Sequence, residues 1–245
     1  MSRTKSEIPF VGLHAHSVAG SVFDALGFPQ DHMDFAYENG NDALALTDHG
    51  NMNGLAYQVL HAKKMKSQGK DFKPIYGCEA YFVPSVTEWR EEYERAKEDK
   101  KRARALAKSQ AGLSVEDEGA TKSGNNNILN RRRHLVLIAQ NQTGLNNLFR
   151  LISDSYTEEY FYRYPRIDYD LLKKYGEGII AASACLGGVY AGCLWENREQ
   201  GDEAVLEAMR EVTRKMMDIF GDRWYGELQW NNVPEQHQLN KFIIQ

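Results

Sequence analysis

Two histidines near the start of the chain have the spacing of metal ligands. His14 and His16 end a short apolar run that begins at Phe10. Residues two apart on an extended chain point to the same side, so both imidazoles can reach one ion at the carboxyl end of a strand, where α/β barrels place their sites. A lone pair of this kind also occurs by chance. The interpretation therefore depends on further ligand types.

A third histidine and a carboxylate accompany two later apolar runs. His49 directly follows the run Ala43–Thr47 and its Asp, and Glu79 is the one carboxylate inside the run Pro74–Phe82. A buried carboxylate is costly without a partner, and coordination of one or two cations offsets that cost because its two oxygens can bridge them. The alternative is an edge strand on which Glu79 faces water.

His134 and Cys185 extend the set of candidate ligands. His134 opens the apolar run His134–Ala139, and Cys185 follows the run Ile179–Ala184. Each has an ordinary alternative, a solvent-facing histidine at a strand start and a small buried hydrophobic residue. Beside the histidines and Glu79, Cys185 becomes a credible thiolate ligand, and a histidine-rich set with one thiolate favours zinc over magnesium.

The elements that must position these side chains follow from the spacing of apolar residues. Short apolar runs alternate with segments of helical periodicity, which is typical of βαβ units and predicts an α/β fold. We expect helices over residues 30–38, 55–65 and 203–220. We expect strands over residues 10–13, 43–47, 74–82, 134–139, 178–182 and 224–229.

Composition and charge narrow the class of protein. The 245 residues are 42% hydrophobic and 26% charged, which excludes an intrinsically disordered chain. A formal net charge of −4 shows no global basic excess, so any contact with nucleic acid must be local. Three cysteines are too few for a disulfide scaffold, and no stretch resembles a signal peptide or a membrane span. These features predict a cytoplasmic protein with no membrane partner.

Residues 86–133 differ from their surroundings and predict an insertion within a single domain spanning 1–245. The first part is a strong helix former with acidic residues early and basic residues late, as the helix dipole prefers. The second part, residues 114–127, is expected to be a mobile loop. The ordinary interpretation is a solvated charged helix face. The alternative is a DNA contact through a group of basic residues: Lys100, Lys101, Arg102, Arg104, Arg131, Arg132 and Arg133.

Five segments, taken in order, resemble those of a known family. LHAHS, LALTDHGNMNG, PIYGCEAYF, RHLVLIAQN and ASACLGG look like successive motifs of the PHP (polymerase and histidinol phosphatase) domain. The similar version is the one at the N-terminus of the C-family replicative DNA polymerases of bacteria and their phages, the DNA polymerase III alpha subunits. The resemblance runs over essentially the whole chain.

The resemblance implies a distorted, TIM-like (βα)7 barrel with up to three divalent metal ions, zinc, manganese or magnesium, at the carboxyl ends of its strands. The family also has a final Asp-x-His strand that this sequence lacks, so the barrel is expected to be truncated before its last strand. Asp24 matches a family ligand with altered spacing. The implied ligands are His14, His16, Asp24, His49, Glu79, His134 and Cys185.

For function, the resemblance implies a fragment of a DNA-directed DNA polymerase, a nucleotidyltransferase of DNA replication, without the polymerase site. The fragment itself would be a metal-dependent phosphoesterase that acts as a 3′→5′ proofreading exonuclease. Its partners would be primer-template DNA, the remaining polymerase domains and replisome subunits. Two alternatives remain: a catalytically silent structural or interaction module of the polymerase, and, less in keeping with the motifs, a free-standing small-molecule phosphatase.

Overall fold

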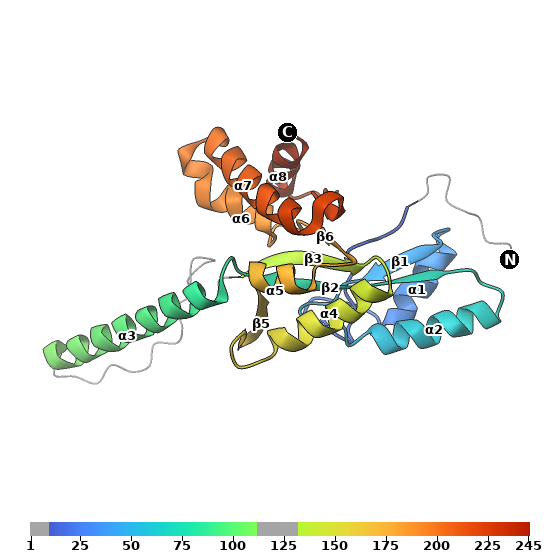
Figure 1. Ribbon diagram of the computed structural model, residues 1–245, viewed down its shortest axis with the longest axis horizontal. Helices are drawn as coiled ribbons and strands as arrows, with labels where there is room; N and C mark the ends of the chain where they lie inside the picture. Colours follow the sequence, from blue (N-terminus) through green and yellow to red (C-terminus); the bar gives the residue numbers. More distant parts are fainter. Residues whose placement is uncertain (1–9, 112–131) are drawn as a thin grey trace.

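The computed structural model describes residues 10–111 and 132–245, and it confirms the α/β class. A mixed sheet forms the centre, with helices packed on it (Figure 1). The strands are β1 (Ala43–Leu46), β2 (Lys73–Phe82), β3 (Arg133–Ala139), β4 (Phe161–Tyr162), β5 (Tyr164–Ile167), β6 (Ile179–Ala182) and β7 (Trp224–Tyr225). The α-helices are α1 (Pro29–Glu38), α2 (Leu55–Ser67), α3 (Val86–Ala111), α4 (Gln142–Ser155), α5 (Tyr169–Tyr175), α6 (Val189–Asn197), α7 (Asp202–Phe220) and α8 (Pro234–Ile244).

The expected elements form, with two differences at the ends of the sheet. Residues 10–13 were expected to be a strand, but only Gly12 makes a bridge, to Leu44 of β1. The segment still lies along β1, because the N–H groups of Ala45 and Thr47 donate to the carbonyls of Gly12 and Ala15. At the other end, β7 covers only the first two residues of the expected strand 224–229.

Strand β3 runs against its neighbours, which the simple βαβ pattern did not predict. β2 pairs in parallel with β1 and β5, whereas β3 is antiparallel to both β2 and β6. Phe82, the last residue of β2, is paired with Arg133, the first residue of β3. The segment between them therefore leaves the sheet and re-enters it at the same end of the strands, as a long hairpin connection does. His134 consequently lies at the end of the sheet where β1 and β2 have their carboxyl ends.

The two faces of the sheet bury different sets of side chains, because successive residues of a strand alternate between faces. Glu79 is paired with Val136, and Tyr81 with His134, so these four share one face. Val136 also belongs to a small apolar cluster with Ala45, Ile138 and Ala184. Polar residues at the strand ends thus adjoin a small apolar cluster.

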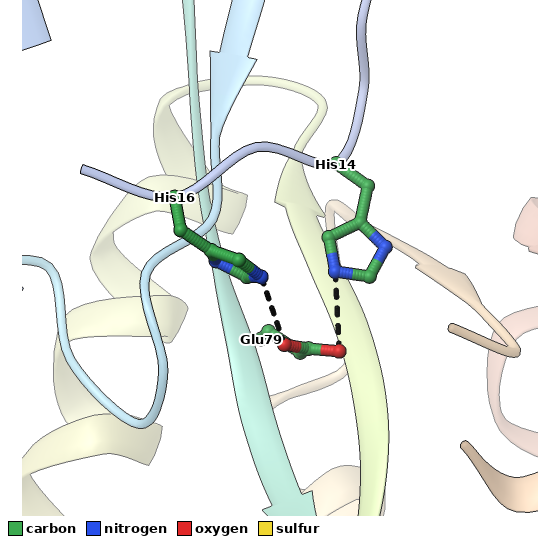
Figure 2. A group of neighbouring side chains, drawn as sticks. All are labelled: His14, His16 and Glu79. Atoms are coloured by element: carbon green, nitrogen blue, oxygen red, sulfur yellow. Dashed lines mark ion pairs between the residues drawn. The ribbon is translucent and has the colours of Figure 1, made fainter. Parts of the chain in front are cut away.

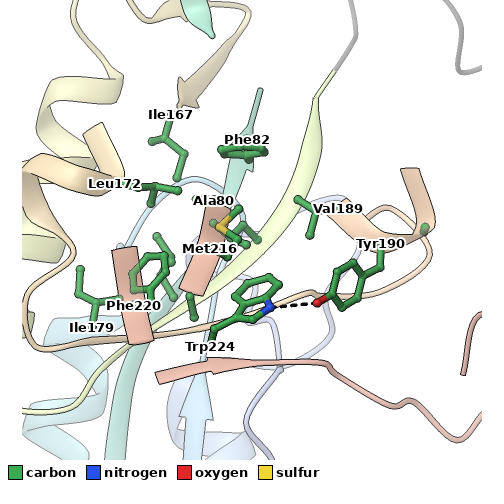
Figure 3. Packing of buried hydrophobic residues seen from close by; sticks show 14 of the residues in the cluster. Ala80, Phe82, Ile167, Leu172, Ile179, Val189, Tyr190, Met216, Phe220 and Trp224 are labelled. Carbon is green, nitrogen blue, oxygen red and sulfur yellow. Dashed lines mark hydrogen bonds between the residues drawn. The ribbon is translucent and has the colours of Figure 1, made fainter. Parts of the chain in front are cut away.

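The opposite face packs against helices and forms the main core. Ala80 and Phe82 of β2 lie there with residues of α5, α6 and α7 (Figure 3). Trp224 of β7 is fixed in this core because its indole N–H donates to the hydroxyl of Tyr190, at 2.9 Å. From α4, Leu148 and Leu151 enter the same core and are fully buried. Apolar burial on this face holds the sheet in place.

Helix α3 projects away from the sheet along the long axis of the molecule (Figure 1). Its base is anchored by Val86 and Trp89, which are buried with Val83. The guanidinium of Arg166, itself fully buried, lies 3.8 Å from the centre of the Trp89 ring. The predicted helix is therefore present, and the loop expected over residues 114–127 lies outside the described residues. The assignment of 86–133 as an insertion in one domain stays a prediction. Within the described residues, no helix is long and apolar enough to cross a membrane.

Replacing Leu148 by alanine should reduce the free energy of unfolding by about 2–5 kcal/mol, because it leaves a cavity in the main core. Leu148 is 0% exposed, whereas its neighbour Phe149 is 41% exposed. Phe149→Ala is the matched control and should cost less than about 1 kcal/mol. Urea unfolding followed by circular dichroism measures both. Equal losses in the two variants would contradict this description of the core.

Candidate metal centre

The carboxylate of Glu79 is fully buried and faces four imidazoles. Its Oε1 lies 3.1 Å from Nε2 of His14 and 3.0 Å from Nδ1 of His134. Its Oε2 lies 3.3 Å from Nε2 of His16 and 2.8 Å from Nδ1 of His49. Figure 2 shows His14 and His16 reaching the two carboxylate oxygens from one extended segment. Each oxygen of Glu79 is thus shared by two histidines.

Three separate parts of the sheet deliver these side chains to one place. The segment with His14 and His16 runs along β1, and the N–H of Thr47 ties it to that strand. His49 follows β1 and forms a parallel bridge with Glu79. His134 comes from the start of β3, which lies beside the other histidines because β3 is antiparallel to β2. The structure therefore brings these four histidines and Glu79 together at the strand ends, where the sequence predicts them.

Asp48, a buried aspartate that was not among the candidate ligands, orders the loop after His16. The carboxylate of Asp48 accepts hydrogen bonds from the backbone N–H and the hydroxyl of Ser17, at 2.6 and 2.9 Å. It also accepts one from the hydroxyl of Ser21, at 3.0 Å. The hydroxyl oxygen of Ser21 in turn accepts from the N–H of His49. Asp48 thus connects the two histidine-bearing segments.

The remaining two candidates lie on the periphery of the cluster. Oδ2 of Asp24 is 2.8 Å from Nε2 of His49, and its side chain is 54% exposed, so it stands at the solvent side. Sγ of Cys185 lies 3.8 Å from Oε1 of Glu79 and 3.7 Å from Nδ1 of His134. All seven candidate ligands therefore converge on one region, and their role as ligands stays a prediction.

Glu227 also belongs to this region, although the sequence analysis did not select it. Its Oε1 lies 2.7 Å from Nδ1 of His14, on the side of the ring that faces away from Glu79. The signal that could have found it is a second lone carboxylate in an expected strand, here residues 224–229. Strand β7 is parallel to β6 and has the same direction as β2, so the residues that follow it lie at the end of the sheet that carries Glu79 and the histidines.

Burial and the shared carboxylate shift the titration of the cluster. Burial opposes a charged imidazole, but hydrogen bonds to Glu227 and Glu79 outweigh it and raise the pKa of His14 to about 10. Burial would raise the pKa of Glu79, yet the surrounding histidines hold it well below its usual range. Burial, reinforced by the charge of Glu79, raises the pKa of the Cys185 thiol to about 11. Without a bound cation, the thiol of Cys185 is therefore protonated at neutral pH.

The geometry and the donor types fit divalent metal ions. Nδ1 of His49 and Oε2 of Glu79 are buried 2.8 Å apart without the alignment of a hydrogen bond, and neither has another hydrogen-bond partner among the described residues. Two ligands that each lie about 2.1 Å from one ion are about 3 Å apart at the right angle of an octahedral site, close to the separation of these two atoms. Two sets of three donors have their ligand atoms within 4.8 Å of one another, and they share Glu79: His14, His16 and Glu79, and His49, Glu79 and His134.

The basic residues proposed to contact DNA fall into separate groups. Arg132 lies near the cluster, its guanidinium carbon 3.8 Å from the ring centre of Tyr164 and 4.9 Å from that of Tyr81. Arg133 pairs instead with Glu196. Arg131 lies outside the described residues. The others are exposed on the projecting part of α3: Lys100, Lys101, Arg102 and Arg104.

Comparison with known proteins gives a consistent match. A family model described as "PHP domain" matches residues 12–231. The chain is 36% identical over 239 residues to DNA polymerase III subunit alpha of Aquifex aeolicus (strain VF5), a match that covers 96% of this chain and 17% of that protein. The same subunit of Deinococcus radiodurans is 34% identical over 238 residues, with 96% and 14% covered. The chain thus spans less than a fifth of the length of these relatives.

Two solved structures show weaker similarity. A proposed metal-dependent phosphoesterase from Bifidobacterium adolescentis matches with a TM-score of 0.42 at 11% identity, over 95% of this chain and 82% of that chain. An amidohydrolase from Chromobacterium violaceum matches with a TM-score of 0.29 at 15% identity, over 85% and 49%.

The metal-free protein should depend on His14 for stability at low pH and lose that contribution as the pH rises. The folded pKa of His14, about 10, exceeds its ordinary value of 6.5. A raised pKa stabilises the folded state fully below the unfolded pKa, and the effect disappears as pH approaches the folded pKa. Urea unfolding of chelator-treated wild type and His14→Gln at pH 6, 8 and 10 measures this.

The difference in unfolding free energy between wild type and His14→Gln should shrink steadily from pH 6 to pH 10. The variant serves as the control for all other titrating groups, since these are common to both proteins. A difference that stays constant, or grows with pH, would show that the carboxylates do not raise the pKa of His14.

Proposed function

Because the chain belongs to the PHP domain family, we propose that it is a metal-dependent phosphoesterase whose divalent ions lie around Glu79. The observation that carries this proposal is the fully buried carboxylate shared by four imidazoles. Up to three ions of zinc, manganese or magnesium are proposed. The proposed ligands are His14, His16, Asp24, His49, Glu79, His134 and Cys185.

The division of labour follows from the positions of these groups. Bound divalent ions would supply a water of lowered pKa and neutralise charge on a phosphate. Glu79 and the imidazoles are packed too closely around one another to act as free acids or bases, so we assign them to holding the ions. Asp24 is the exposed member and marks the side from which a substrate approaches.

The 3′ end of a DNA strand is the substrate that we propose, with 3′→5′ exonuclease activity that proofreads primer ends. The support is the identity of the relatives, which are subunits of a DNA polymerase. Because the relatives are much longer than this chain, we further propose that it is part of a DNA-directed DNA polymerase of the bacterial cytoplasm, encoded by the bacterium or by one of its phages. The remaining domains of that polymerase and other replisome subunits would then be partners of this chain, with no membrane partner.

Among the candidate basic residues that the structure describes, Arg132 is the best placed to contact a phosphate next to the scissile one. Its guanidinium lies against Tyr81, whose ring is stacked at 5.8 Å on that of His49 and lies 5.5 Å from that of His134. Arginine stacked on aromatic rings beside a metal site is suited to a nucleic-acid backbone. The cations of α3 lie farther out on a projecting helix and are proposed only as a secondary contact.

His49→Gln should lower metal-dependent release of nucleotides from a 3′-labelled single-stranded oligonucleotide by more than about 100-fold. It removes a proposed ligand, and loss of even outer partners of a metal costs about 10–100-fold. His61→Gln is the matched control, because His61 pairs with Asp34 on α1, outside the cluster. The assay compares zinc, manganese, magnesium and chelator.

Release that resists chelator, or that His61→Gln lowers as much as His49→Gln does, would contradict a metal centre at Glu79. If wild type binds metal but releases no nucleotide under any of these conditions, the exonuclease proposal fails. The structural or interaction role in the polymerase would then remain.

Arg132→Ala should raise KM for the oligonucleotide about 10-fold and leave hydrolysis of a small phosphodiester, bis-p-nitrophenyl phosphate, within about twofold of wild type. The reason is that a phosphate contact contributes to strand binding and depends on salt, whereas the small substrate has no second phosphate. Arg104→Ala on α3 is the comparison variant. A larger effect from Arg104→Ala would place the main contact on the helix.

A further inference from the structure

We propose that Glu227 is a positioning residue that fixes the ring of His14 for metal binding, an inference that rests on the proposed metal site. Oε1 of Glu227 lies 2.7 Å from Nδ1 of His14, while Nε2 of the same ring lies 3.1 Å from Glu79. A neutral imidazole that binds a metal through Nε2 carries its proton on Nδ1 and needs an acceptor there. Glu227 supplies that acceptor.

Glu227 is itself held from two sides, so its carboxylate has a defined position. Its backbone N–H donates to the hydroxyl of Ser183, just beyond the end of β6, at 2.9 Å. Its Oε1 accepts a hydrogen bond from the side-chain amide of Gln229, at 2.8 Å. The carbonyl of Gln229 accepts from Asn240 of α8, at 2.9 Å. The acceptor for His14 is therefore built into the structure and is only 17% exposed.

A comparison with His16 shows what a carboxylate acceptor adds. Nδ1 of His16 lies 2.9 Å from the carbonyl oxygen of Thr47, which is a neutral acceptor. A carboxylate draws the Nδ1 proton more strongly and so makes the other nitrogen a better electron donor. Of the two neighbouring histidines, His14 is thus the one whose Nε2 is strengthened as a ligand.

The position of Glu227 distinguishes this role from direct ligation. The Nδ1 and Nε2 atoms of one imidazole point in different directions, and Glu227 contacts the one that faces away from Glu79. The imidazole therefore lies between the two carboxylates. An ion held by Glu79 and Nε2 of His14 is separated from Glu227 by the ring.

Two variants test the role through metal affinity and a direct spectroscopic signal. Glu227→Ala should weaken zinc or manganese binding about 10–100-fold, measured by competition with a chromophoric chelator. Glu227→Gln keeps an oxygen that can accept the Nδ1 proton and should weaken binding less. The number of ions bound at saturation should stay that of wild type. Glu235→Gln, an exposed carboxylate at the start of α8, is the matched control and should change nothing.

The second readout is the slowly exchanging Nδ1 proton of His14 in ¹⁵N-edited NMR spectra, assigned by its absence in His14→Gln. It should be present in wild type with or without metal and absent in Glu227→Ala. Unchanged affinity and an unchanged proton signal in Glu227→Ala would overturn the proposal. A fall in the number of ions bound would overturn it too, by making Glu227 a ligand. Metal affinity that depends on Glu227 in a protein without hydrolytic activity would leave this inference standing and reject the proposed function.

Discussion

Burial of the Glu79 carboxylate is the constraint on which the rest of the structure depends. A carboxylate with no exposed surface is strongly disfavoured unless charge or hydrogen-bond donors surround it. Here four imidazoles supply those partners, and each must come from a defined point of the sheet. The cost of burial therefore requires the sheet, the N-terminal segment and the start of β3 to meet at one place.

The direction of β3 is what makes this meeting possible. If β3 were parallel to β2, its first residue would lie at the opposite end of the strands, and His134 would be separated from Glu79 by the length of the strand. The connection that contains α3 returns the chain to the end of the sheet that it left, so β3 runs antiparallel to β2. The connection that contains α3 therefore determines where His134 lies, whether or not α3 contacts a nucleic acid.

Much of the fold and of the site could be predicted from the sequence, because the apolar runs are short and end in polar residues. The strands at 43–47 and 74–82 and the ligand candidates at their ends required only local pattern. Other features depend on the partners that the fold brings together. Glu227 became visible as part of the site only when its strand was placed beside His14, more than two hundred residues away. Equally, nothing local separates Arg132, which lies by the site, from Arg133, which pairs with Glu196.

Binding of divalent metal by the cluster around Glu79 can be tested by elemental analysis of the purified chain beside Glu79→Gln. At least two equivalents of zinc or manganese are expected per wild-type chain, because two donor sets share this carboxylate. The variant should lose most of that metal while its circular dichroism spectrum stays unchanged. No bound metal in wild type after dialysis against either ion, or full retention in Glu79→Gln, would contradict a metal centre at Glu79.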